Sequence, residues 1–503
     1  MFFDNKQNIL VTPAESEETI KEPVKYFDFG KLDILLCKIL IWEPKDKTKI
    51  EVADPPEDQC IVLRECQSIE IEESYKKLIG TASVKFPRGT VIKKTITKQL
   101  LDNNKIKPVY AYRMADGTIV EKRSDYVAAK PEDFKVGQRI RIYLGYYHDN
   151  GTKVFKSSKE RQQEMDRIVT SQRPMFDGYI TKCSVSTPIE LKCENIASGL
   201  KRKTCIPMQS DKDATVNDFL EEGGKYYQLE GTGIKLHPDT AKWNTNIGMV
   251  KLYEDLTVAD MLAEWEKYKL YCFIRYDSNG VPCLKVGRSY FSTAGKESIL
   301  NEDSGSANRT IDFDYHVAKD DLTLMNVDPE YLAVSAEGFD YVKENGKTKQ
   351  IKRAVTIRLN PVWQGPGDTE HEKFQILSQV ELNKKSMKLG ATPKTIQAKD
   401  IDLSKYTVIS YTATHIGISE EDLIKEAKNY FEGYNMNGIE GSVTVFGDFN
   451  FESGVKVHLL DKRQPEKNGW YLVEEVNTRF GTNGYRQTLK IPYCISKDKE
   501  DKK

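Results

Sequence analysis

The sequence predicts a β-dominated α+β protein in which two similar antiparallel β-barrels flank a small helix-plus-hairpin module. Three observations support this prediction. Segments that alternate between apolar and polar residues, as strands with one buried face do, occur near both ends of the chain. One turn-and-strand motif occurs in each of these two regions. Two capped helices and a hairpin fall between them.

The motif that occurs twice is a Phe-x-x-Gly turn followed by a strand. The copy at 134–144 reads Phe-Lys-Val-Gly-Gln-Arg-Ile-Arg-Ile-Tyr-Leu, and the copy at 451–460 reads Phe-Glu-Ser-Gly-Val-Lys-Val-His-Leu-Leu. Their separation is too long for a solenoid repeat. We therefore predict two copies of one domain with other material between them. Residues from about 130 to 194 and from about 440 to 492 should superpose as barrel segments.

An Asx-Gly-aromatic step follows each copy of the motif. It reads Asp177-Gly178-Tyr179 after the first copy and Asn468-Gly469-Trp470 after the second. A valine stands seven residues past each glycine, at Val185 and Val476. We expect both steps to be turns that lead into alternating strands, which favours duplication over coincidence.

Residues 27–194 form the first predicted barrel. Strand patterns lie at 32–42, 67–72 and 81–88, and the repeated strand resumes the sheet at 137–144. We expect two insertions on the rim of this barrel, at about 91–129 and 150–173. The first has a hairpin signal at 115–118. The second contains helix-forming residues with little apolar face, which predicts a solvated or partner-dependent helix.

Residues 195–305 form the predicted small α/β module. Thr-x-x-acid sequences at 215–218 and 257–260 each predict a capped helix. The second helix would place four apolar residues on one face, which we interpret as a packing stripe and not as a cofactor site. These residues are Val258, Met261, Leu262 and Trp265. A hairpin that turns at 277–280 completes the module.

Residues 306–496 form the second predicted barrel, which includes a helix at 419–433. Strand patterns lie at 310–315, 331–336 and 354–359, before the repeated motif. The apolar face of the helix comprises Leu423, Ile424, Ala427, Tyr430 and Phe431. The termini differ in character. We expect 1–26 to be an arm that becomes ordered only against a neighbour, and 497–503 to be a frayed charged tail.

Composition excludes several classes of protein. The chain has 503 residues, and its 75 Lys and Arg balance 76 Asp and Glu, so no overall field selects nucleic acid or membrane. No window approaches the roughly 18 apolar residues of a membrane span, and no secretory leader is recognisable. The nine cysteines lack a Cys-x-x-Cys pair, which predicts reduced thiols in a protein assembled in a cytoplasm.

The sequence nominates no catalytic, cofactor-binding or metal-binding residue. The spacing of Cys183, Cys193 and Cys205 fits no zinc knuckle. Gly231-Thr-Gly233 is interpreted as a turn, and Lys201-Arg-Lys203 is a small basic cluster that suits either phosphate contacts or ordinary surface. No metalloprotease, nucleophile-elbow or phosphate-loop motif occurs. The six histidines are dispersed, at 148, 237, 316, 371, 415 and 458. We therefore expect neither an enzyme nor a cofactor.

Several segments together resemble the bacteriophage baseplate hub family, also called late control gene D proteins, and the hub portion of type VI secretion spike proteins. Their order along the chain, more than any single segment, carries the resemblance. The segments are Thr-Ala-Ser-Val-Lys-Phe-Pro-Arg at 81–88, Val-Gly-Gln-Arg-Ile-Arg-Ile-Tyr-Leu-Gly-Tyr at 136–146, Phe-Asp-Gly-Tyr-Ile-Thr at 176–181, Pro-Ile-Glu-Leu-Lys-Cys-Glu at 188–194, and the aromatic strands at 469–476 and 480–487. The insertions at about 91–129 and 150–173 depart from the family pattern.

The resemblance implies a structural role in a phage tail baseplate or a related contractile injection system. Three subunits with two like barrels each would form a ring that adapts a hexameric tail tube to a trimeric spike. The ring would enclose a channel for the tape measure protein and for DNA, which would pass without sequence-specific binding. Spike and cell-wall hydrolase would be separate chains. The location implied is the virion tail, after assembly in the host cytoplasm. Two alternatives stay open, a tail-associated cell-wall hydrolase and a receptor- or carbohydrate-binding tail-tip protein.

Overall fold

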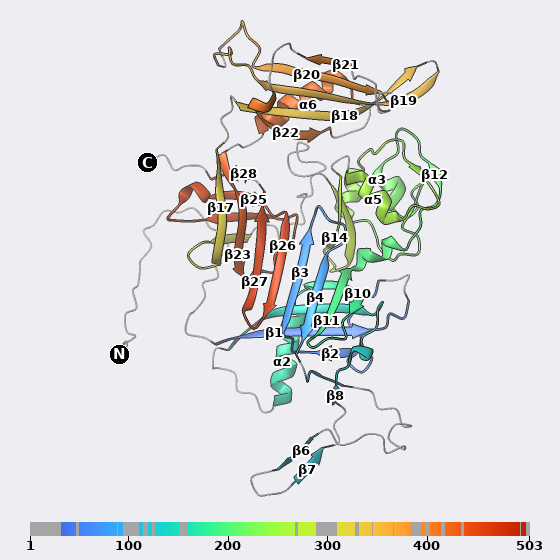
Figure 1. Cartoon of the computed structure of the whole chain (residues 1–503), viewed down its shortest axis with the longest axis vertical. Coiled ribbons are helices and arrows are strands. Elements are labelled where there is room, and N and C mark those ends of the chain that lie inside the picture. Colours follow the sequence, from blue (N-terminus) through green and yellow to red (C-terminus); the bar gives the residue numbers. More distant parts are fainter. Residues whose placement is uncertain are drawn as a thin grey trace.

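Strands dominate the computed structural model, and this confirms the predicted β-dominated α+β class (Figure 1). The structure describes residues 32–46, 50–87, 89–93, 110–113, 119–122, 126–149, 158–266, 270–287, 309–326, 331–344, 346–365, 367–383, 394–397, 403–413, 418–433, 437–492 and 494–498. The predicted arm at 1–26 and nearly all of the predicted tail lie outside these residues. No helix in the described part of the chain is long and apolar enough to span a membrane.

One 11-stranded sheet joins strands from both ends of the chain. In spatial order its strands are β17 (Val317–Asn326), β23 (Asn437–Phe446), β27 (Gly484–Ile491), β26 (Glu475–Gly481), β3 (Ser68–Ser74), β4 (Thr81–Phe86), β11 (Ile189–Asn195), β10 (Phe176–Cys183), β9 (Arg139–Asp149), β1 (Leu32–Trp42) and β2 (Ile61–Leu63). Its described strand pairs are all antiparallel. The N-terminal and C-terminal halves of the sheet meet where β26 pairs with β3.

The N-terminal half of this sheet, from β3 to β2, is the first unit. Alternate residues of its strands point to one side, as in the buried–exposed pattern of β4, and form a common apolar core. Ile71, Val84, Ile142 and Leu191 are among the core residues. Within the described residues no ladder joins β2 to β3, so the unit is a barrel-like sheet without recorded closure.

A helix covers part of the opposite face of the first unit. Helix α2 (Ser158–Thr170) packs Met165, Ile168 and Val169 against an apolar cluster on β1 and β9 that includes Tyr143. The prediction of a solvated or partner-dependent helix was therefore wrong. Three apolar residues at helical spacing suffice here because the receiving strands present large side chains on their outer face.

The second unit combines the C-terminal half of the large sheet with a smaller sheet that faces it. The smaller sheet contains β16 (Arg309–Asp312), β24 (Lys456–Leu460), β25 (Gly469–Leu472) and β28 (Cys494–Lys497). Val443 and Leu489 of the large sheet and Val457 and Tyr471 of the smaller one are fully buried in the shared core. Strand β16 runs parallel to β24.

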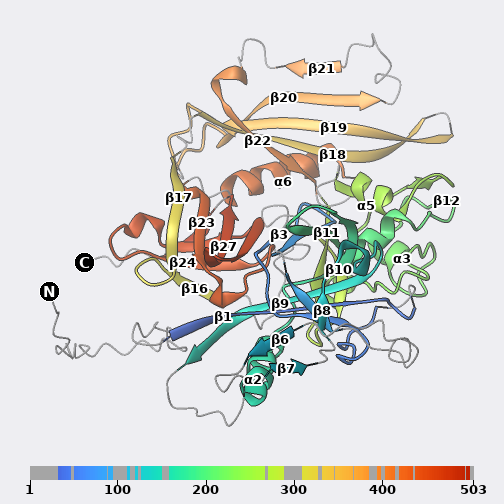
Figure 2. The same ribbon diagram turned by 60° about the horizontal axis from the view of Figure 1, so that its bottom comes forward.

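A separate layer is inserted into the second unit between β17 and β23. Its five strands are β18 (Leu332–Glu344), β19 (Lys347–Leu359), β20 (Phe374–Asn383), β21 (Lys394–Gln397) and β22 (Thr407–Thr412), and α6 (Glu420–Gly433) packs on them. We call this layer the appended sheet. Figure 2 shows α6 on the side of the appended sheet that faces the rest of the molecule.

The appended sheet differs from the predicted organisation, in which 306–496, with helix 419–433, is one barrel. The apolar face of α6, with Leu423, Ala427 and Phe431, packs on β18 and β19 and not on the second unit. Strands β17 and β23 that flank the insertion pair with each other, and Asn326 lies opposite Asn437. The chain thus leaves and re-enters the large sheet at one register position.

The small α/β module fills the chain between β11 and β16. It contains η2 (Ile196–Lys201), β12 (Met208–Gln209), α3 (Val216–Leu220), α4 (Pro238–Trp243), β13 (Lys251–Leu252), α5 (Val258–Glu266), β14 (Tyr271–Tyr276) and β15 (Pro282–Gly287). Thr215 and Asp218 form the expected capping box of α3. Val258, Met261, Leu262 and Trp265 are buried in the core of the module, as their spacing predicts.

Two short antiparallel strand pairs, one nested within the other along the chain, represent the insertion at about 91–129. Strand β5 (Val91–Lys93) pairs with β8 (Tyr126–Ala128), and β6 (Tyr110–Arg113) pairs with β7 (Ile119–Lys122). Residues 115–118, which carry the hairpin signal, lie outside the described residues, but β6 and β7 on either side of them are antiparallel.

Candidate functional site

The two copies of the Phe-x-x-Gly motif form the same turn. Phe134 and Phe451 are both buried, and Gly137 and Gly454 have φ values of 92° and 75°. Each glycine donates its N–H to a carbonyl on the neighbouring strand over 2.8 Å, to Ile180 in the first unit and to Val473 in the second. The left-handed backbone explains why glycine occupies both positions.

The return hydrogen bonds match as well. Ile180 N–H donates to the Gln138 carbonyl and Val473 N–H to the Val455 carbonyl, both over 2.9 Å. In each unit the residue that receives the bond from the glycine therefore bonds back to the residue after the glycine. This reciprocal pattern fixes the equivalence of β9 with β24.

The Asx-Gly steps, in contrast, are not equivalent turns. Asp177 and Gly178 lie inside β10, where a Cβ on Gly178 would stand 2.1 Å from the Glu194 carbonyl oxygen. Asn468 and Gly469 instead end a short 3-10 turn and start β25. The expectation of a turn at both steps was wrong for the first copy. A glycine after an Asx residue can also mark a close approach of two strands.

The offset of the two valines also has no structural equivalent. Val185 lies beyond β10 with 89% of its side chain exposed, whereas Val476 is buried in β26. The residue that bonds to the turn glycine is Ile180 in the first unit and Val473 in the second. It lies two residues after Gly178 but four residues after Gly469, so the second copy is two residues longer between these points. The length of the connection has therefore changed, although the turn has not.

Strand order repeats over five strand positions in each unit. In the first unit β3, β4, β11, β10 and β9 are neighbours in that order. In the second unit the order is β17, β23, β27, then the segment that contains β26 and β25, then β24. Val473 still bonds to Val455, and Glu474 bonds to the Lys490 carbonyl, so one strand changes sheets at this point. The strands also follow the same order along the chain, which supports the duplication.

The two units join directly through β26 and β3. Seven residue pairs, from Glu475 opposite Ser74 to Gly481 opposite Ser68, align along this junction. Phe480 and Tyr485 of the second unit belong to the core of the first. Arg479 forms an ion pair of 2.9 Å with Glu70 across the junction. The junction therefore combines backbone pairing with shared apolar packing.

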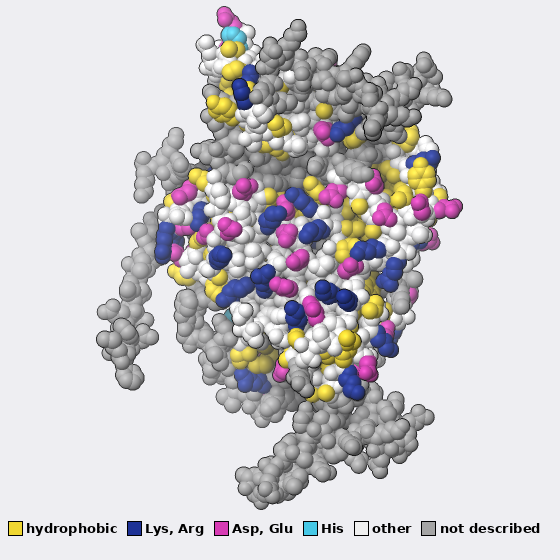
Figure 3. All heavy atoms as spheres, viewed as in Figure 1, with side chains coloured by type: hydrophobic (Ala, Val, Ile, Leu, Met, Phe, Trp, Pro, Cys, Tyr) yellow, Lys and Arg dark blue, Asp and Glu magenta, His cyan; other side chains and the backbone are white. Residues whose placement is uncertain are grey.

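One face of the sheet around this junction is polar and balanced in charge. Residues that alternate with core positions point outward and include both signs on neighbouring strands. They are Glu70 and Glu72 on β3, Lys85 on β4, Glu190, Lys192 and Glu194 on β11, Glu475 and Arg479 on β26, and Arg486 and Lys490 on β27. Figure 3 shows positive and negative side chains interspersed where Figure 1 places β26, β3 and β4. We call this surface the polar sheet face.

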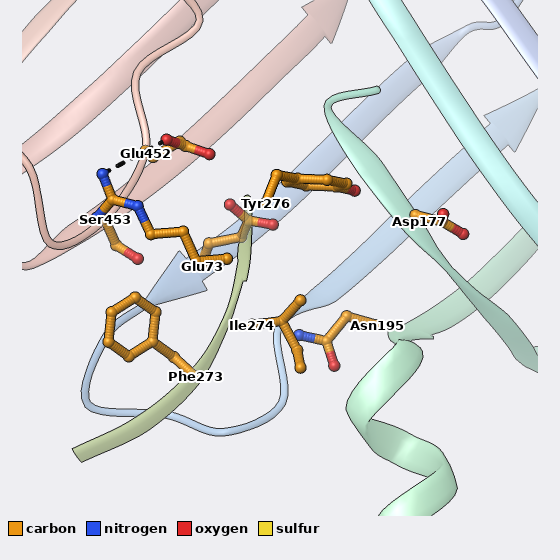
Figure 4. Close-up of a pocket in the computed structure, with 9 residues that line it drawn as sticks. Glu73, Asp177, Asn195, Phe273, Ile274, Tyr276, Glu452 and Ser453 are labelled. Atoms are coloured by element: carbon orange, nitrogen blue, oxygen red, sulfur yellow. Dashed lines mark ion pairs between the residues drawn. The ribbon is translucent and has the colours of Figure 1, made fainter. Parts of the chain in front are cut away.

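A small cavity lies where the first unit, the second unit and the module meet (Figure 4). Figure 4 shows Glu73 of β3 and Tyr276 of β14 pointing into the same space. Arg173, from the loop before β10, pairs with Glu452 of the second unit, and its guanidinium lies 5.6 Å from the Tyr276 ring centre. Arg275 of the module reaches the same Glu452 at 4.0 Å.

The size of this cavity argues for a structural role. Its volume is about 20 Å³, enough for roughly one water molecule, whereas ligand pockets have about 300–1,000 Å³. Burial raises the pKa of Glu73 to about 7, and the Coulombic attraction of Arg173 opposes this rise. A partly buried carboxyl with a raised pKa thus lies at the meeting point of three parts of the chain.

A larger hollow of about 550 Å³ lies on the surface of the module. Asp211 dominates its chemistry, because the carboxylate accepts a hydrogen bond from Lys225 Nζ over 2.6 Å and another from the Tyr226 hydroxyl over 2.9 Å. These bonds hold the pKa of Asp211 below its ordinary value. The polar groups of the hollow are therefore largely engaged with one another, and Tyr226 is the aromatic residue in its lining.

The remaining residues considered for chemistry are dispersed in space. His415 lies outside the described residues, and the other histidines have separate partners: Tyr146 for His148, Asp239 for His237, Asp312 for His316, Asp368 for His371 and Asp498 for His458. Burial raises the pKa of Cys205 to about 11, which disfavours its thiolate. Lys201 pairs with Glu194 at 2.9 Å. Over the residues described, no group of three His, Cys, Asp or Glu side chains is placed to hold a metal ion.

No family model matches the chain, and the search of curated proteins returns no match. Among solved structures, the 43 kDa tail protein of prophage MuSo2 from Shewanella oneidensis is similar with a TM-score of 0.43 and 9% identity, over 90% of this chain and 98% of that one. The tail protein from Neisseria meningitidis MC58 gives 0.40 and 10%, over 91% and 96%. A chain of the half-lidded Francisella PdpA-VgrG complex gives 0.39 and 9%, over 94% and 60%.

Proposed function

We propose that this chain is the structural hub subunit of a phage tail baseplate or related contractile injection system. In this proposal three copies form a ring between a hexameric tail tube and a trimeric spike. The single observation that carries it is the duplication, in which two units share the Phe-x-x-Gly turn, the spatial strand order and the order along the chain.

Symmetry gives the duplication its functional meaning. Six tail tube subunits present six equivalent surfaces. A trimeric ring can offer six similar surfaces in return only if each of its chains contributes two. The two units are also fixed to one another, because β26 and β3 pair along their length and share a core. A fixed pair of like units suits an adapter between six-fold and three-fold partners better than two units on a flexible linker would.

The channel of the proposed ring would be lined by the polar sheet face. Acidic and basic side chains alternate there, as in the Arg479–Glu70 pair, so the surface has no excess of positive charge. Basic side chains that contact phosphates retain DNA, and a balanced surface lets it pass. This supports passage of the tape measure protein and DNA without sequence-specific binding.

The alternative functions receive less support. The central cavity of about 20 Å³ is too small for a peptidoglycan strand, so it does not favour a cell-wall hydrolase. The hollow on the module has one lining aromatic residue, Tyr226, and its hydroxyl is bonded to Asp211. A carbohydrate-binding surface would instead present several exposed aromatic rings.

The test is the mass of the purified full-length protein by light scattering, alone and mixed with its tail tube protein. We expect three times the subunit mass of 57.5 kDa, and a larger species when the tube protein is added. A protein that stays monomeric and does not bind the tube protein would contradict the hub. Digestion of purified peptidoglycan by the same protein would support the hydrolase instead.

A further inference from the structure

The duplication leaves two strand edges without their equivalent neighbour. In the second unit, the strand β25–β26 pairs with β24 over its first part and with β3 of the first unit over its second part. In the first unit, β10 pairs with β9 only from Phe176 to Tyr179. Its last residues, Thr181 to Cys183, have β11 on one side and no described strand on the other.

The strand that corresponds to β3 is β17. Each is the outermost strand of its unit, and each pairs with the strand that follows it in its unit, β4 or β23. Strand β3 is covered by β26, whereas β17 is a terminal strand of the large sheet. By this equivalence, the strand expected beside the end of β10 is one like β17. The hairpin expected beside β17 is one like β10–β11.

We propose that the end of the β10–β11 hairpin of one copy docks on the free edge of β17 of the next copy, as β26 docks on β3 within the chain. The occupant of each edge is therefore a second copy of this chain. The contact is head-to-tail, and contacts of this type close into rings when the rotation allows. This inference rests on the proposed ring and specifies which edges join it.

Exposed apolar side chains mark both edges. Val185, just past β10, is 89% exposed, and Val136, in the turn that bonds to β10, is 68% exposed. On β17, Leu324 is 58% exposed. Natural proteins protect free strand edges, because an edge with exposed apolar residues invites pairing. Each edge presents an exposed apolar residue where the duplication predicts a partner, beside exposed charged residues.

Charged residues are also present at both edges. Within the chain, basic Arg479 on the hairpin strand β26 pairs with acidic Glu70 on β3. The hairpin end in the first unit has the exposed basic residue Lys182, and β17 has the exposed acidic residue Asp321. A basic residue on the hairpin and an acidic residue on the receiving strand are therefore available to pair across the proposed contact.

The test measures self-association of the full-length protein by sedimentation equilibrium. Val185→Asp and Leu324→Asp should each weaken association by about tenfold or more, because each buries an unpaired charge in the contact. The double variant Val185→Lys with Leu324→Asp should recover part of the loss. Val362→Asp is the matched control, because Val362 is 54% exposed but lies in the appended sheet between β19 and β20.

The outcomes separate this proposal from the proposed function. If the wild type forms a trimer and both Asp variants keep its mass, the edge contact is wrong and the hub survives. If the wild type stays monomeric at about 100 μM and also does not bind the tube protein, the edge contact and the hub function are both wrong. We expect the variants to fold, because all three positions are exposed. A circular dichroism spectrum and a melting temperature equal to those of the wild type would show this for each variant.

Discussion

The first and second units share one framework but differ in what has been inserted into it. The first unit is interrupted between β9 and β10 by α2 and between β4 and β9 by the two short strand pairs. The second is interrupted between β17 and β23 by the appended sheet. Strand order and the glycine turn are unchanged, while connections vary. The comparison shows that the order of the hydrogen-bonded strands is what the two units share. Insertions in the loops between these strands leave that order unchanged.

The largest expected difference between the units is at their Asx residues. Asp177 is buried and accepts hydrogen bonds from Arg139 and Arg141, at 2.8 Å and 2.9 Å from the nearest guanidinium nitrogens. Asp177→Ala should lower the free energy of unfolding by about 3–5 kcal/mol, because two buried guanidinium groups lose their shared carboxylate. Asn468→Ala, the matched change, should cost only about 1 kcal/mol, since it removes one bond to the Asp461 N–H. Urea denaturation measures both, and equal losses would contradict the larger contribution expected of the buried Asp177 carboxylate.

A pH-dependent difference should be the next in size. The pKa of Glu73 is about 7, above its ordinary value of 4.5, so the folded protein binds this proton more tightly than the unfolded chain does. Its contribution is fully present below pH 4.5 and is lost as pH rises through about 7. Between pH 5 and 8, stability should fall by about 1–3 kcal/mol more in the wild type than in Glu73→Gln. Glu72→Gln, an exposed change on the same strand, is the control. Parallel pH profiles for wild type and Glu73→Gln would exclude this role.

The two turn glycines should behave alike. Gly137→Ala and Gly454→Ala should each cost about 1–2 kcal/mol, because both positions need a left-handed backbone. Neither Cβ would clash, because the one at Gly454 would make an ordinary contact of 3.4 Å with the Phe273 ring and the one at Gly137 would meet nothing within 4 Å. Gly199→Ala is the control, because a Cβ there meets nothing within 4 Å and the backbone is not left-handed. Thermal unfolding measures all three. A large effect at only one turn would break the equivalence of the units.

The smallest expected effect concerns the ion pair across the junction. Arg479→Ala should cost about 0.2–1 kcal/mol, because both Arg479 and Glu70 are exposed and water screens their attraction. The cost should shrink in high salt. Phe480→Ala removes a core side chain at the neighbouring position and serves as the contrast. If Arg479→Ala were the more costly of the two, electrostatics and not packing would hold the units together.

The sequence predicts those features that have a local physical cause. Capping boxes at Thr215 and Thr257, the packing stripe that ends at Trp265 and the turn at Gly137 and Gly454 follow from the residues themselves. The appended sheet could not be separated from the second unit, because its strands alternate in the same way. Pairing between β26 and β3 has no local signal either, since it joins opposite ends of the chain.

Some misses have an identifiable signal in retrospect. Helix α2 has Met165, Ile168 and Val169 at helical spacing, and that short stripe was sufficient for packing. Helix α4 begins at Pro238 after His237, whose ring nitrogen accepts a hydrogen bond from the Asp239 N–H. Proline at the first helical position is a start signal. The cavity around Glu73 was beyond prediction, because its lining comes from three distant segments.

The adjacent entry and exit of the appended sheet make it exchangeable. Since Asn326 and Asn437 lie opposite each other in one antiparallel strand pair, the two strands could be joined by a short turn, and the residues between them removed without altering the pairing of β17 with β23. The end of a strand pair where the chain leaves and re-enters at adjacent positions is where domain insertion is tolerated. Related chains can therefore be expected to differ most at this position, where a different appendage can be acquired without any change to the duplicated framework.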